Sequence, residues 1–541
     1  MIVFDDVSIW YDDPEAGREP VLSGADFSLE EGELTLVVGP TGSGKSTLLR
    51  CMNGLVPHFS GGTLRGKVLV DGRDTREYRP RDLADVVGFV MQDPVSSFVT
   101  DTVEEEIAYG MEALGVDGVA MRRRVEETLD LLGLADVRRR PLRDLSGGQQ
   151  QRVAIGGVLA AGPRILVLDE PTSALDPVAA EDVLSSLHRL VHDLGLTVVV
   201  AEHRLERVIH HADGVLILDG GVVSPVLDPA QAMVTSAVHP PLIGLGRALG
   251  WSPLPLSVRD ARRRARGLRE KLSALPLTQP ADTADPVLAP LGQLTGVGVR
   301  RGAVTALRDV DLAIRPGEVV ALMGRNGAGK STLLASMVGQ LAPATGTVKV
   351  GPISPHNEKP AAIVRFAGLV PQDPTLLLYA DSVADECAAA DRDFALSPGT
   401  TAALLEQINP GLPEDRHPRD LSEGQRLSLA LSVILASSPP LLLLDEPTRG
   451  LDYAAKHRLV VLLRALAASG HGALLATHDV EMAAEVATRV VVLADGEVVA
   501  DGPAPAVLSG SPAFAPQVAK ILHPLRLLTV EAALDSAGAA S

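Results

Sequence analysis

Two short stretches of the chain have the residue types and spacing of phosphate-binding loops. The first is GPTGSGKST and the second is GRNGAGKST. Both fit the pattern G-x-x-x-x-G-K-[ST], in which backbone N–H groups surround phosphate oxygens, a lysine reaches the terminal phosphates and a hydroxyl binds Mg²⁺. The residues that we expect to contact a nucleotide here are Gly39, Pro40, Thr41, Gly42, Ser43, Gly44, Lys45, Ser46 and Thr47, and Gly324, Arg325, Asn326, Gly327, Ala328, Gly329, Lys330, Ser331 and Thr332.

The segments around these loops predict the local fold that such loops require. An apolar run, ELTLVV or EVVALM, precedes each loop and predicts a buried strand, and a helical pattern follows it. A strand that turns into a helix presents the N–H groups of the helix N-terminus to an anion. We therefore expect two phosphate sites rather than two incidental glycine-rich turns.

Length, charge and cysteine content limit the class of protein. With 541 residues, of which 46% are hydrophobic, the chain is long enough for two globular domains. Its 49 Lys and Arg against 68 Asp and Glu give a net charge of −19, which argues against nucleic acid as the main partner. Cys51 and Cys387 have neither disulfide nor metal spacing and favour a reducing compartment.

No segment is expected to direct secretion or to cross a membrane. The N-terminal residues MIVFDDVSIWYDD are acidic and alternating, unlike a signal peptide, so we expect a cytosolic protein. The stretch from Leu427 to Leu444 has no charged residue, but Pro439 and Pro440 divide it into a helix and a strand.

The second half of the chain repeats the first. Motifs recur in the same order after both loops, with an offset that shrinks gradually, which indicates an internal duplication. Runs rich in Val, Ile and Leu alternate with helical patterns, which predicts an α/β fold with a parallel sheet in each copy. The proline-rich segment between the copies contains the basic stretch VRDARRRARGLREKL and predicts a linker with one short helix, whose arginines form a solvated face. We divide the chain into a first domain (1–228), a linker (229–290), a second domain (291–515) and a C-terminal tail (516–541).

Four further motifs occur in both copies. In chain order they are Gln92 in VMQDP or Gln372 in VPQDP; LSGGQ (Leu145–Gln149) or LSEGQ (Leu421–Gln425); ILVLDEPTSALD (Ile165–Asp176) or LLLLDEPTRGLD (Leu441–Asp452); and His203 or His478. With the loops, they resemble the nucleotide-binding domain of ATP-binding-cassette (ABC) proteins over nearly the whole chain except the linker and the tail. The resemblance implies two P-loop NTPase domains of the ABC type in tandem, which bind and hydrolyse ATP with Mg²⁺.

The LDEP segments supply neighbouring carboxylates with different expected roles. Asp169 and Asp445 end apolar strands, where a carboxylate can hold Mg²⁺ through its water shell, and the glutamates that follow are placed to polarise the attacking water. The resemblance adds the two histidines as switches that contact the γ-phosphate. The expected catalytic residues are Glu170, His203, Glu446 and His478, and the expected metal-binding residues are Ser46, Gln92, Asp169, Ser331, Gln372 and Asp445.

In the ABC family, the LSGGQ-type signature makes a second anion site that faces the ATP of the partner domain. The resemblance therefore implies that the two domains pair head-to-tail within one chain and that each completes the other's site. The duplication then supplies the partner covalently, which raises its effective concentration. The signature residues implied to bind ATP are Ser146, Gly148, Gln149, Ser422, Gly424 and Gln425.

Two aligned positions make the two copies unequal. Tyr11 fits the aromatic residue that stacks on adenine, whereas Arg301 takes this place in the second copy and can also stack. Glu423 replaces the first glycine of the second signature and adds a negative charge near the expected γ-phosphate, an arrangement able to slow the site with Lys45. Since both catalytic carboxylates and both histidines are present, we expect both sites to be competent.

The segment after the first glutamine indicates a task beyond hydrolysis. QDPVSSFVTDTVEEEIAYG is similar to a stretch of energy-coupling-factor (ECF) transporter ATPases, and AEHRLERV is similar to their fused two-cassette members. Ser97 and Leu377 stand where that subfamily often has Gln, which leaves the subtype open. The resemblance implies a peripheral subunit at the cytoplasmic face of the membrane. It would power import of a vitamin or a transition-metal ion through a membrane scaffold and a small substrate-binding membrane protein.

A short helix of the scaffold is expected to dock beside each glutamine. Phe98, Val99 and Leu377 are the apolar candidates to contact it, and a place in the core is an equal alternative for each.

Other functions stay open. The ATPase of another importer, for peptides or sugars, fits the same motifs. A soluble ABC-F-type ATPase that acts on the ribosome would also lack membrane spans, but the acidic charge, the proline-broken linker and THDVEM disfavour it. A DNA-repair cassette would be expected to bring zinc-binding cysteines or a coiled coil.

Overall fold

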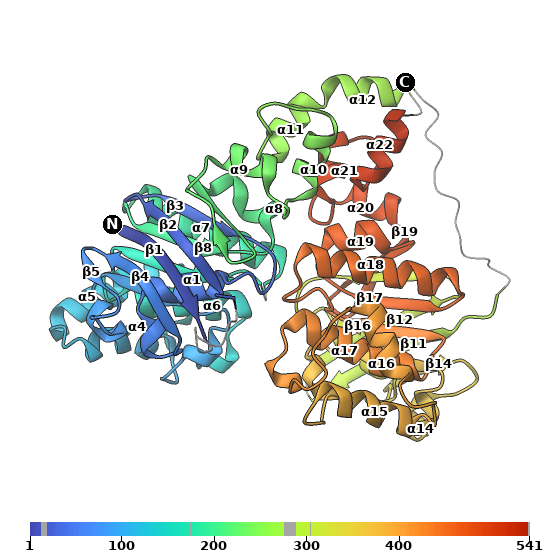
Figure 1. Cartoon of the computed structure of the whole chain (residues 1–541). Helices are drawn as coiled ribbons and strands as arrows, with labels where there is room; N and C mark the ends of the chain where they lie inside the picture. The colour runs from blue at the N-terminus through green and yellow to red at the C-terminus, as the bar shows by residue number, and fades with distance from the viewer. Residues whose placement is uncertain (12–18, 174, 275–287, 303, 539–541) are drawn as a thin grey trace. The chain divides into compact units, whose positions relative to one another are not determined.

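The computed structural model describes residues 1–11, 19–173, 175–274, 288–302 and 304–538. The chain forms two compact units, Met1–Ser257 and Val258–Ser541 (Figure 1). Each unit contains one antiparallel sheet and one larger, mainly parallel sheet. The α/β fold with two tandem copies is confirmed.

The large sheet of the first unit has the strand order β10-β9-β3-β8-β7-β6, in which β10 runs antiparallel to β9 at one edge. Its five parallel strands are short and almost completely buried, as expected for a sheet covered on both faces. The antiparallel sheet has the order β2-β1-β4-β5. The strands are β1 (Ile2–Trp10), β2 (Leu22–Leu29), β3 (Leu34–Val38), β4 (Thr63–Val70), β5 (Arg73–Asp74), β6 (Val87–Val90), β7 (Ile165–Asp169), β8 (Thr197–Ala201), β9 (Gly214–Asp219) and β10 (Val222–Val223).

Some helices of the first unit begin at a residue whose side chain caps the N-terminus. Asp117, Ser146 and Asp176 each accept a hydrogen bond from a backbone N–H in the first turn of the helix that follows. The helices are α1 (Lys45–Met52), α2 (Leu55–His58), α3 (Pro80–Leu83), α4 (Val103–Ala113), α5 (Gly118–Leu131), α6 (Gly147–Leu159), α7 (Pro177–His192), α8 (Leu205–Val208), α9 (Pro229–Thr235) and α10 (Pro241–Ala248).

The second unit repeats this topology. Its large sheet has the order β15-β16-β17-β13-β18-β19, which matches the first unit strand for strand, and its antiparallel sheet has the order β12-β11-β14. The strands are β11 (Gly292–Arg301), β12 (Val304–Ile314), β13 (Val319–Met323), β14 (Thr345–Val350), β15 (Ala367–Val370), β16 (Leu441–Asp445), β17 (Gly472–Ala476), β18 (Arg489–Ala494) and β19 (Glu497–Pro503).

The helices of the second unit correspond to those of the first, with additional helices at both ends of the unit. They are α11 (Val258–Arg264), α12 (Arg266–Ser273), α13 (Lys330–Met337), α14 (Pro360–Ile363), α15 (Val383–Asp393), α16 (Thr400–Ile408), α17 (Glu423–Ala436), α18 (Tyr453–Ala468), α19 (Val480–Val486), α20 (Ala504–Gly510), α21 (Gln517–Leu522) and α22 (Val530–Gly538).

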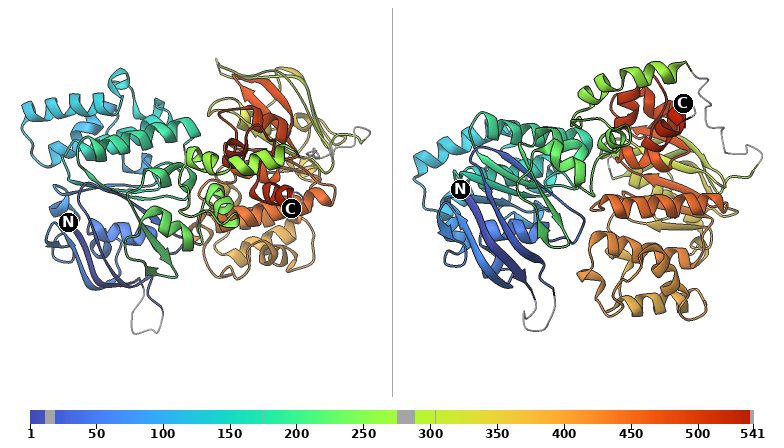
Figure 2. Two further views of the ribbon diagram at one scale, coloured as in Figure 1. Left: turned by 90° about the horizontal axis from the view of Figure 1, so that it is seen from above. Right: turned by 45° about the horizontal axis from the view of Figure 1, so that its top comes forward.

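Each unit is layered around its large sheet (Figure 2). Helix α1 lies between the two sheets of the first unit, and α13 does so in the second, where apolar residues of both sheets enclose it. The opposite face of the second large sheet is covered by α17 and α18. This layering places the N-termini of α1 and α13 at the ends of the parallel strands. The polar residues of the motifs follow the same strand ends in both units.

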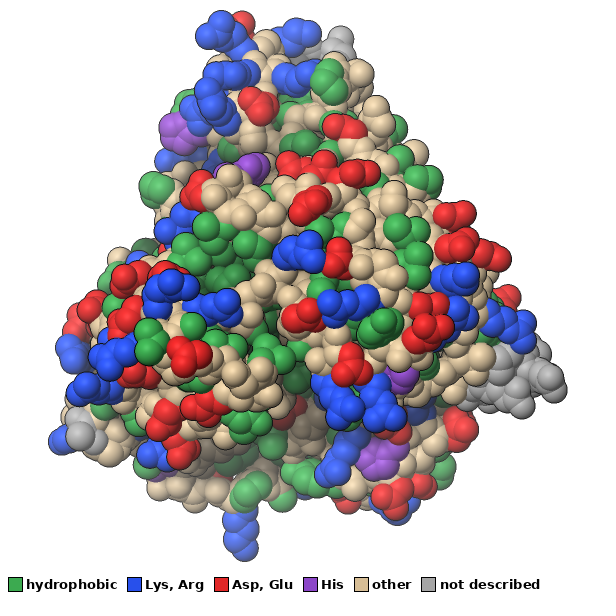
Figure 3. Space-filling view, turned by 90° about the vertical axis from the view of Figure 1, so that its left-hand side faces the viewer, with side chains coloured by type: hydrophobic (Ala, Val, Ile, Leu, Met, Phe, Trp, Pro, Cys, Tyr) green, Lys and Arg blue, Asp and Glu red, His purple; other side chains and the backbone are tan. Residues whose placement is uncertain are grey.

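The segment between the copies is more helical than predicted. The expectation of one short helix in 229–290 is wrong, since the described part contains α9, α10, α11 and α12. Within the second unit, Nη1 of Arg262 donates to the carbonyl oxygen of Lys520 at 3.0 Å, and Nη1 of Arg269 donates to that of Ile521 at 2.9 Å. The basic stretch therefore joins the C-terminal helices, and most of its other arginines are exposed. Figure 3 shows Lys and Arg side chains gathered at the top of the view, at the level of α11 and α12 in Figure 1.

The uncharged stretch from Leu427 to Leu444 is divided as predicted, because α17 ends at Ala436 and β16 begins at Leu441. Among the described residues, no helix is both long and apolar enough to span a bilayer.

Candidate nucleotide sites

The first phosphate-binding loop lies between β3 and α1, as the sequence predicts. Lys45 is 5% exposed, and its Nζ donates to the carbonyl oxygens of Gly39 at 2.8 Å and Pro40 at 2.9 Å. The ammonium group is thus held against the loop. A β-carbon at Gly39 would lie 2.2 Å from the carbonyl oxygen of Leu218 on β9, so only glycine lets the loop pass this close to the sheet.

The second loop, between β13 and α13, has the same construction. Nζ of Lys330 donates to the carbonyl oxygens of Gly324 at 2.9 Å and Arg325 at 3.3 Å. A β-carbon at Gly324 would lie 2.3 Å from the carbonyl oxygen of Leu493 on β18. The two loops therefore present a buried lysine and a helix N-terminus in the same arrangement, which suits a phosphate group.

A hydroxyl from each loop meets the carboxylate at the end of a neighbouring strand. Ser46 is hydrogen-bonded to Asp169, and Ser331 is hydrogen-bonded to Asp445. Burial raises the pKa of both aspartates above the usual value, and these hydrogen bonds and nearby cationic side chains counter only part of that shift. A divalent cation beside the carboxylates would favour their ionised form, so the donor set fits Mg²⁺.

Two further observations bear on this fit. Oδ1 of Asp445 is buried with no hydrogen-bond partner in the part of the chain that the structure describes. In that part, no group of three or more His, Cys, Asp or Glu residues is arranged to hold a metal ion. A cation here would therefore take most of its ligands from phosphate and water, as Mg²⁺ commonly does.

Each catalytic candidate glutamate contacts the histidine of its own unit. Nε2 of His203 lies 2.5 Å from Oε1 of Glu170, and Nδ1 of His478 lies 2.7 Å from Oε2 of Glu446. All four side chains are buried. Both glutamates have φ of 50°, a left-handed conformation that costs free energy in a residue other than glycine. The same strained backbone is thus kept at the same point in both units.

The surroundings of the two glutamates differ. Nε2 of Gln92 donates to Oε2 of Glu170 at 3.0 Å. In the second unit, Nζ of Lys330 lies 3.5 Å from Oε1 of Glu446. Burial tends to raise the pKa of Glu446, but the hydrogen bond and charge of His478, together with Lys330, outweigh it, so the pKa is lowered. Gln372 is exposed beside a cavity that Glu446 also lines.

A further carboxylate of the first unit was missed by the sequence analysis. Glu202 is 2% exposed, and its Oε1 accepts hydrogen bonds from the backbone N–H of Thr172 at 2.9 Å and from the hydroxyl of Thr172 at 2.6 Å. Its Oε2 accepts one from the N–H of His203 at 3.2 Å. Glu202 therefore connects the segment after Glu170 to the histidine. The one sign of this carboxylate in the sequence is that the first copy has AEH where the second copy has ATH.

The two signatures begin helices with identical caps. The Ser146 hydroxyl accepts from the N–H of Gln149 at 3.3 Å, and the N–H of Ser146 donates to the Gln149 side chain at 3.0 Å. Ser422 and Gln425 make the same two bonds at the same distances. Gly148 and Gly424 lie in the first turns of α6 and α17. Each signature thus presents a helix N-terminus, a group that suits an anion.

The two candidate adenine-stacking residues differ in their surroundings. Tyr11 is 43% exposed, and its hydroxyl lies 3.1 Å from the hydroxyl of Thr47 in the phosphate-binding loop. Arg301 is exposed at the end of β11. A ring face is therefore available near the first loop, whereas the second unit offers a guanidinium group.

Apolar side chains lie exposed just after each glutamine. Val99 is 61% exposed and Phe98 is half-buried. In the second unit, Leu377 packs against the core, while its neighbours Leu376 and Tyr379 are 60% and 84% exposed. The sequence indicates Leu377 but not Leu376 or Tyr379, because position within a run of apolar residues does not show which side chain faces solvent.

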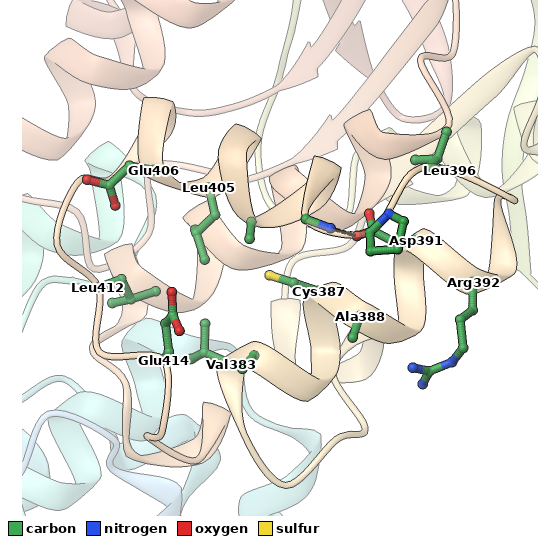
Figure 4. Close-up of a pocket in the computed structure, with 14 residues that line it drawn as sticks. Val383, Cys387, Ala388, Asp391, Arg392, Leu396, Leu405, Glu406, Leu412 and Glu414 are labelled. Carbon is green, nitrogen blue, oxygen red and sulfur yellow. Dashed lines mark hydrogen bonds between the residues drawn. The ribbon is translucent and has the colours of Figure 1, made fainter.

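A cavity of about 410 Å³ in the second unit lies between α15 and α16 (Figure 4). Cys387 faces it, and burial raises the pKa of this thiol to about 11, so it remains protonated and unreactive. Asp391 accepts hydrogen bonds from the N–H groups of Gly399 at 2.7 Å and Thr401 at 2.9 Å and from the Thr401 hydroxyl. These groups are occupied in joining two helices, and we assign them no chemistry.

Comparison with known proteins gives one consistent family. The ABC transporter family model matches residues 22–173 and 307–449. A protein of Streptomyces coelicolor, named as an ABC transporter ATP-binding protein, is 59% identical over 98% of this chain and 99% of its own. A protein of Methanosarcina mazei with the same name is 36% identical over 90% of this chain and 86% of its own.

Among solved structures, an RNase-L inhibitor aligns with a TM-score of 0.57 and 21% identity, over 89% of this chain and 88% of its own. At this low identity the similarity shows only a shared fold, in which one chain contains two nucleotide-binding domains.

Proposed function

Because this chain belongs to the ABC transporter family of ATPases, we propose that it is the ATP-hydrolysing subunit of an importer whose membrane-spanning parts are separate proteins. The observation that supports this best is the pair of exposed apolar segments, one after each glutamine. In the first unit the segment includes Val95 and Val99, and in the second it includes Leu376 and Tyr379. Exposed apolar groups in matching places on two units suit two matching helices of a partner.

In the first site, Lys45 and the loop N–H groups would bind the phosphates, and Ser46 and Asp169 would hold Mg²⁺. When bound, Mg²⁺ would supply positive charge beside the phosphates. Glu170 would accept a hydrogen bond from the attacking water and so orient it. The corresponding residues of the second site are Lys330, Ser331, Asp445 and Glu446.

We further propose that each signature completes the site of the other unit. The N-terminus of α17, with Ser422, Gly424 and Gln425, serves the site of Lys45, and the N-terminus of α6 serves that of Lys330. The equal caps of the two helices support equal use of their first turns.

In each unit, a buried carboxylate binds the backbone of the apolar segment to a helix of the same unit. Oε2 of Glu106 on α4 accepts from the N–H groups of Val99 at 3.1 Å and Thr100 at 2.9 Å. Oε2 of Glu386 on α15 accepts from those of Tyr379 and Ala380, both at 2.8 Å. Both glutamates are buried. If ATP binding moved the glutamine and the apolar segment beside it, α4 or α15 would therefore move as well. Such a coupled movement would carry the change at the nucleotide site to the surface where the partner docks.

We place the chain with the energy-coupling-factor type on its similarity from Gln92 to Gly110. In that type the partners are a scaffold and a small substrate-binding membrane protein, and the cargo is a vitamin or a transition-metal ion. The ATPase would then work at the cytoplasmic face of the membrane. The ATPase of a peptide or sugar importer is the second candidate, since its cassettes use the same motifs.

The test is purification of the tagged chain from a detergent extract of its native membranes. We expect integral membrane proteins to co-purify, and Val99→Asp to reduce their recovery without reducing ATP hydrolysis. Val222→Asp is the matched control, because Val222 is 60% exposed and Val99 is 61% exposed. In the second unit, Tyr379→Asp is compared with Val499→Asp, at a valine that is also 60% exposed.

Recovery without any integral membrane protein, together with co-sedimentation on ribosomes, would reject the importer and favour the ribosome-associated ABC-F type. Equal losses in the test and control variants would show that the apolar segments are not the docking surface.

A further inference from the structure

Within the second unit, the Glu423 side chain of the signature packs toward the turn that contains Gly450. Its Oε2 is buried and has no hydrogen-bond partner among the described residues. A β-carbon added at Gly450 would lie 1.4 Å from this oxygen and 2.5 Å from the carboxyl carbon of Glu423. In this conformation the carboxylate occupies the place of a β-carbon at position 450, so any residue other than glycine there would require the Glu423 side chain to move.

Gly450 lies in the turn that leads from Glu446 to Asp452. The N–H of Arg449 donates to the carbonyl oxygen of Glu446 at 3.2 Å, and the N–H of Leu451 donates to that of Thr448 at 3.3 Å. Gly450 has φ of 65°, a conformation that glycine adopts without strain. A side chain that packs against Gly450 therefore also packs against the turn that begins at Glu446.

The described residues of the corresponding segment in the first unit make the same two turn bonds. The N–H groups of Ser173 and Leu175 donate to the carbonyl oxygens of Glu170 and Thr172, both at 3.2 Å. The signature residue there is Gly147, and among the described residues a β-carbon on it would meet only Leu175, at 3.5 Å, an ordinary contact. By the alignment of TSALD with TRGLD, Ala174, which lies outside the described residues, stands where the second copy has Gly450. The two copies therefore combine a small signature residue with alanine and a large one with glycine.

The capping bonds of α17 match those of α6, so Glu423 does not alter the start of the helix. A carboxylate in the first turn of a helix is favourable, because it lies at the positive end of the helix dipole. Glu423 also lines a cavity of about 230 Å³ together with Gln372 and Glu446. Its side chain thus reaches from the signature helix to the surroundings of the catalytic candidate.

We infer that Glu423 is a positioning residue of the second unit: its side chain fills the space beside Gly450 and fixes the turn that follows Glu446 against the first turn of α17. The effect comes from the shape of the side chain. This inference rests on ATP hydrolysis alone, so it stands or falls independently of the importer.

The test is a double-mutant cycle on the full chain, with kcat and KM for ATP and the midpoint of thermal unfolding measured for each variant. Gly450→Ala places a methyl group against the carboxylate and an alanine at a φ of 65°, and we expect kcat to fall roughly tenfold or more with a smaller change in KM. Glu423→Gly removes the obstacle and leaves a gap, with a fall of roughly threefold. The double variant should have a kcat at least about threefold above the product of the two single effects.

Two comparisons separate positioning from a general loss of stability. Glu423→Gln keeps the shape and removes the charge, so it should retain most of the kcat that Glu423→Gly loses. In the first unit, Gly147→Glu should lower kcat, and adding Ala174→Gly should restore part of it.

Three results would overturn the inference. The first is a double variant whose kcat equals the product of the two single effects. The second is a Glu423→Gln variant whose kcat is as low as that of Glu423→Gly. The third is a fall in the unfolding midpoint of the variants with kcat unchanged.

Discussion

His203 and Glu170 meet through Nε2 of the ring, at 2.5 Å, whereas His478 meets Glu446 through Nδ1, at 2.7 Å. The two nitrogens lie at different distances from the backbone, so the rings are turned differently toward carboxylates that occupy equivalent positions. In both units one short contact joins the group that would orient water and the group that would sense the γ-phosphate. A change in either residue should therefore be felt by the other.

Replacement of each glutamate by glutamine should stop most hydrolysis. Glu170→Gln and Glu446→Gln remove the carboxylate that orients the water, and each should lower turnover on the order of 10²-fold or more. Phosphate release from the purified chain measures this, with an ATP-binding titration as the control, since binding should persist. Unchanged turnover in either variant would show that its site is not catalytic.

The ring orientation predicts opposite rescue patterns for the histidines. A glutamine amide can reach the place of Nε2 and an asparagine amide that of Nδ1. We expect His203→Gln to hydrolyse ATP faster than His203→Asn, and His478→Asn faster than His478→Gln. Steady-state rates of the four variants decide this. The same order of activities at both positions would contradict the difference in orientation.

Several of these relationships could not be predicted from the sequence, although the motifs and topology could. The loops, the paired strands and the split at Pro439 follow from periodicity and from residues with strong backbone preferences. By contrast, burial of the Glu423 carboxylate against Gly450 depends on a contact between segments remote in sequence. Motif matching predicts a charge at that position but says nothing of its direction.

The region between the copies fails for a related reason. Prolines suggested a linker, yet Arg262 and Arg269 bond to carbonyl groups of the C-terminal helix α21. A helix whose partner lies hundreds of residues away has little local evidence in its own sequence, since tertiary packing supplies most of its stability.

The two sites should differ in how they bind the adenine base. Tyr11→Ala removes the exposed ring near the first loop and should weaken nucleotide binding there by roughly threefold to tenfold. Tyr11→Phe keeps the ring and loses only the contact with Thr47, so it should bind nearly as the wild type does. Titration with a fluorescent ATP analogue measures this in a Lys330→Ala background, which isolates the first site. Arg301→Ala in a Lys45→Ala background gives the second site, and equal affinities and equal losses at both sites would remove the proposed asymmetry.

The buried carboxylate of Glu202 should make the stability of the first unit depend on pH. Burial raises the pKa of Glu202 above its usual value of 4.5, and the nearby charge of Glu170 adds to the shift, while hydrogen bonds from Thr172 oppose it. The folded state therefore keeps this proton to a higher pH than the unfolded state does. The free energy of unfolding must then fall as pH rises from 4.5 through the pKa of the folded state, by at most about 1.4 kcal/mol per pH unit.

Glu202→Gln keeps an oxygen that can accept the bonds from Thr172 but cannot ionise, so it should remove this slope. Urea unfolding of wild type and variant at a series of pH values above 4.5 measures the difference between them. All other titrating groups are shared, so they largely cancel in that difference. We expect the stability of the wild type relative to the variant to decrease with pH, and parallel curves would show that Glu202 has the same pKa in both states.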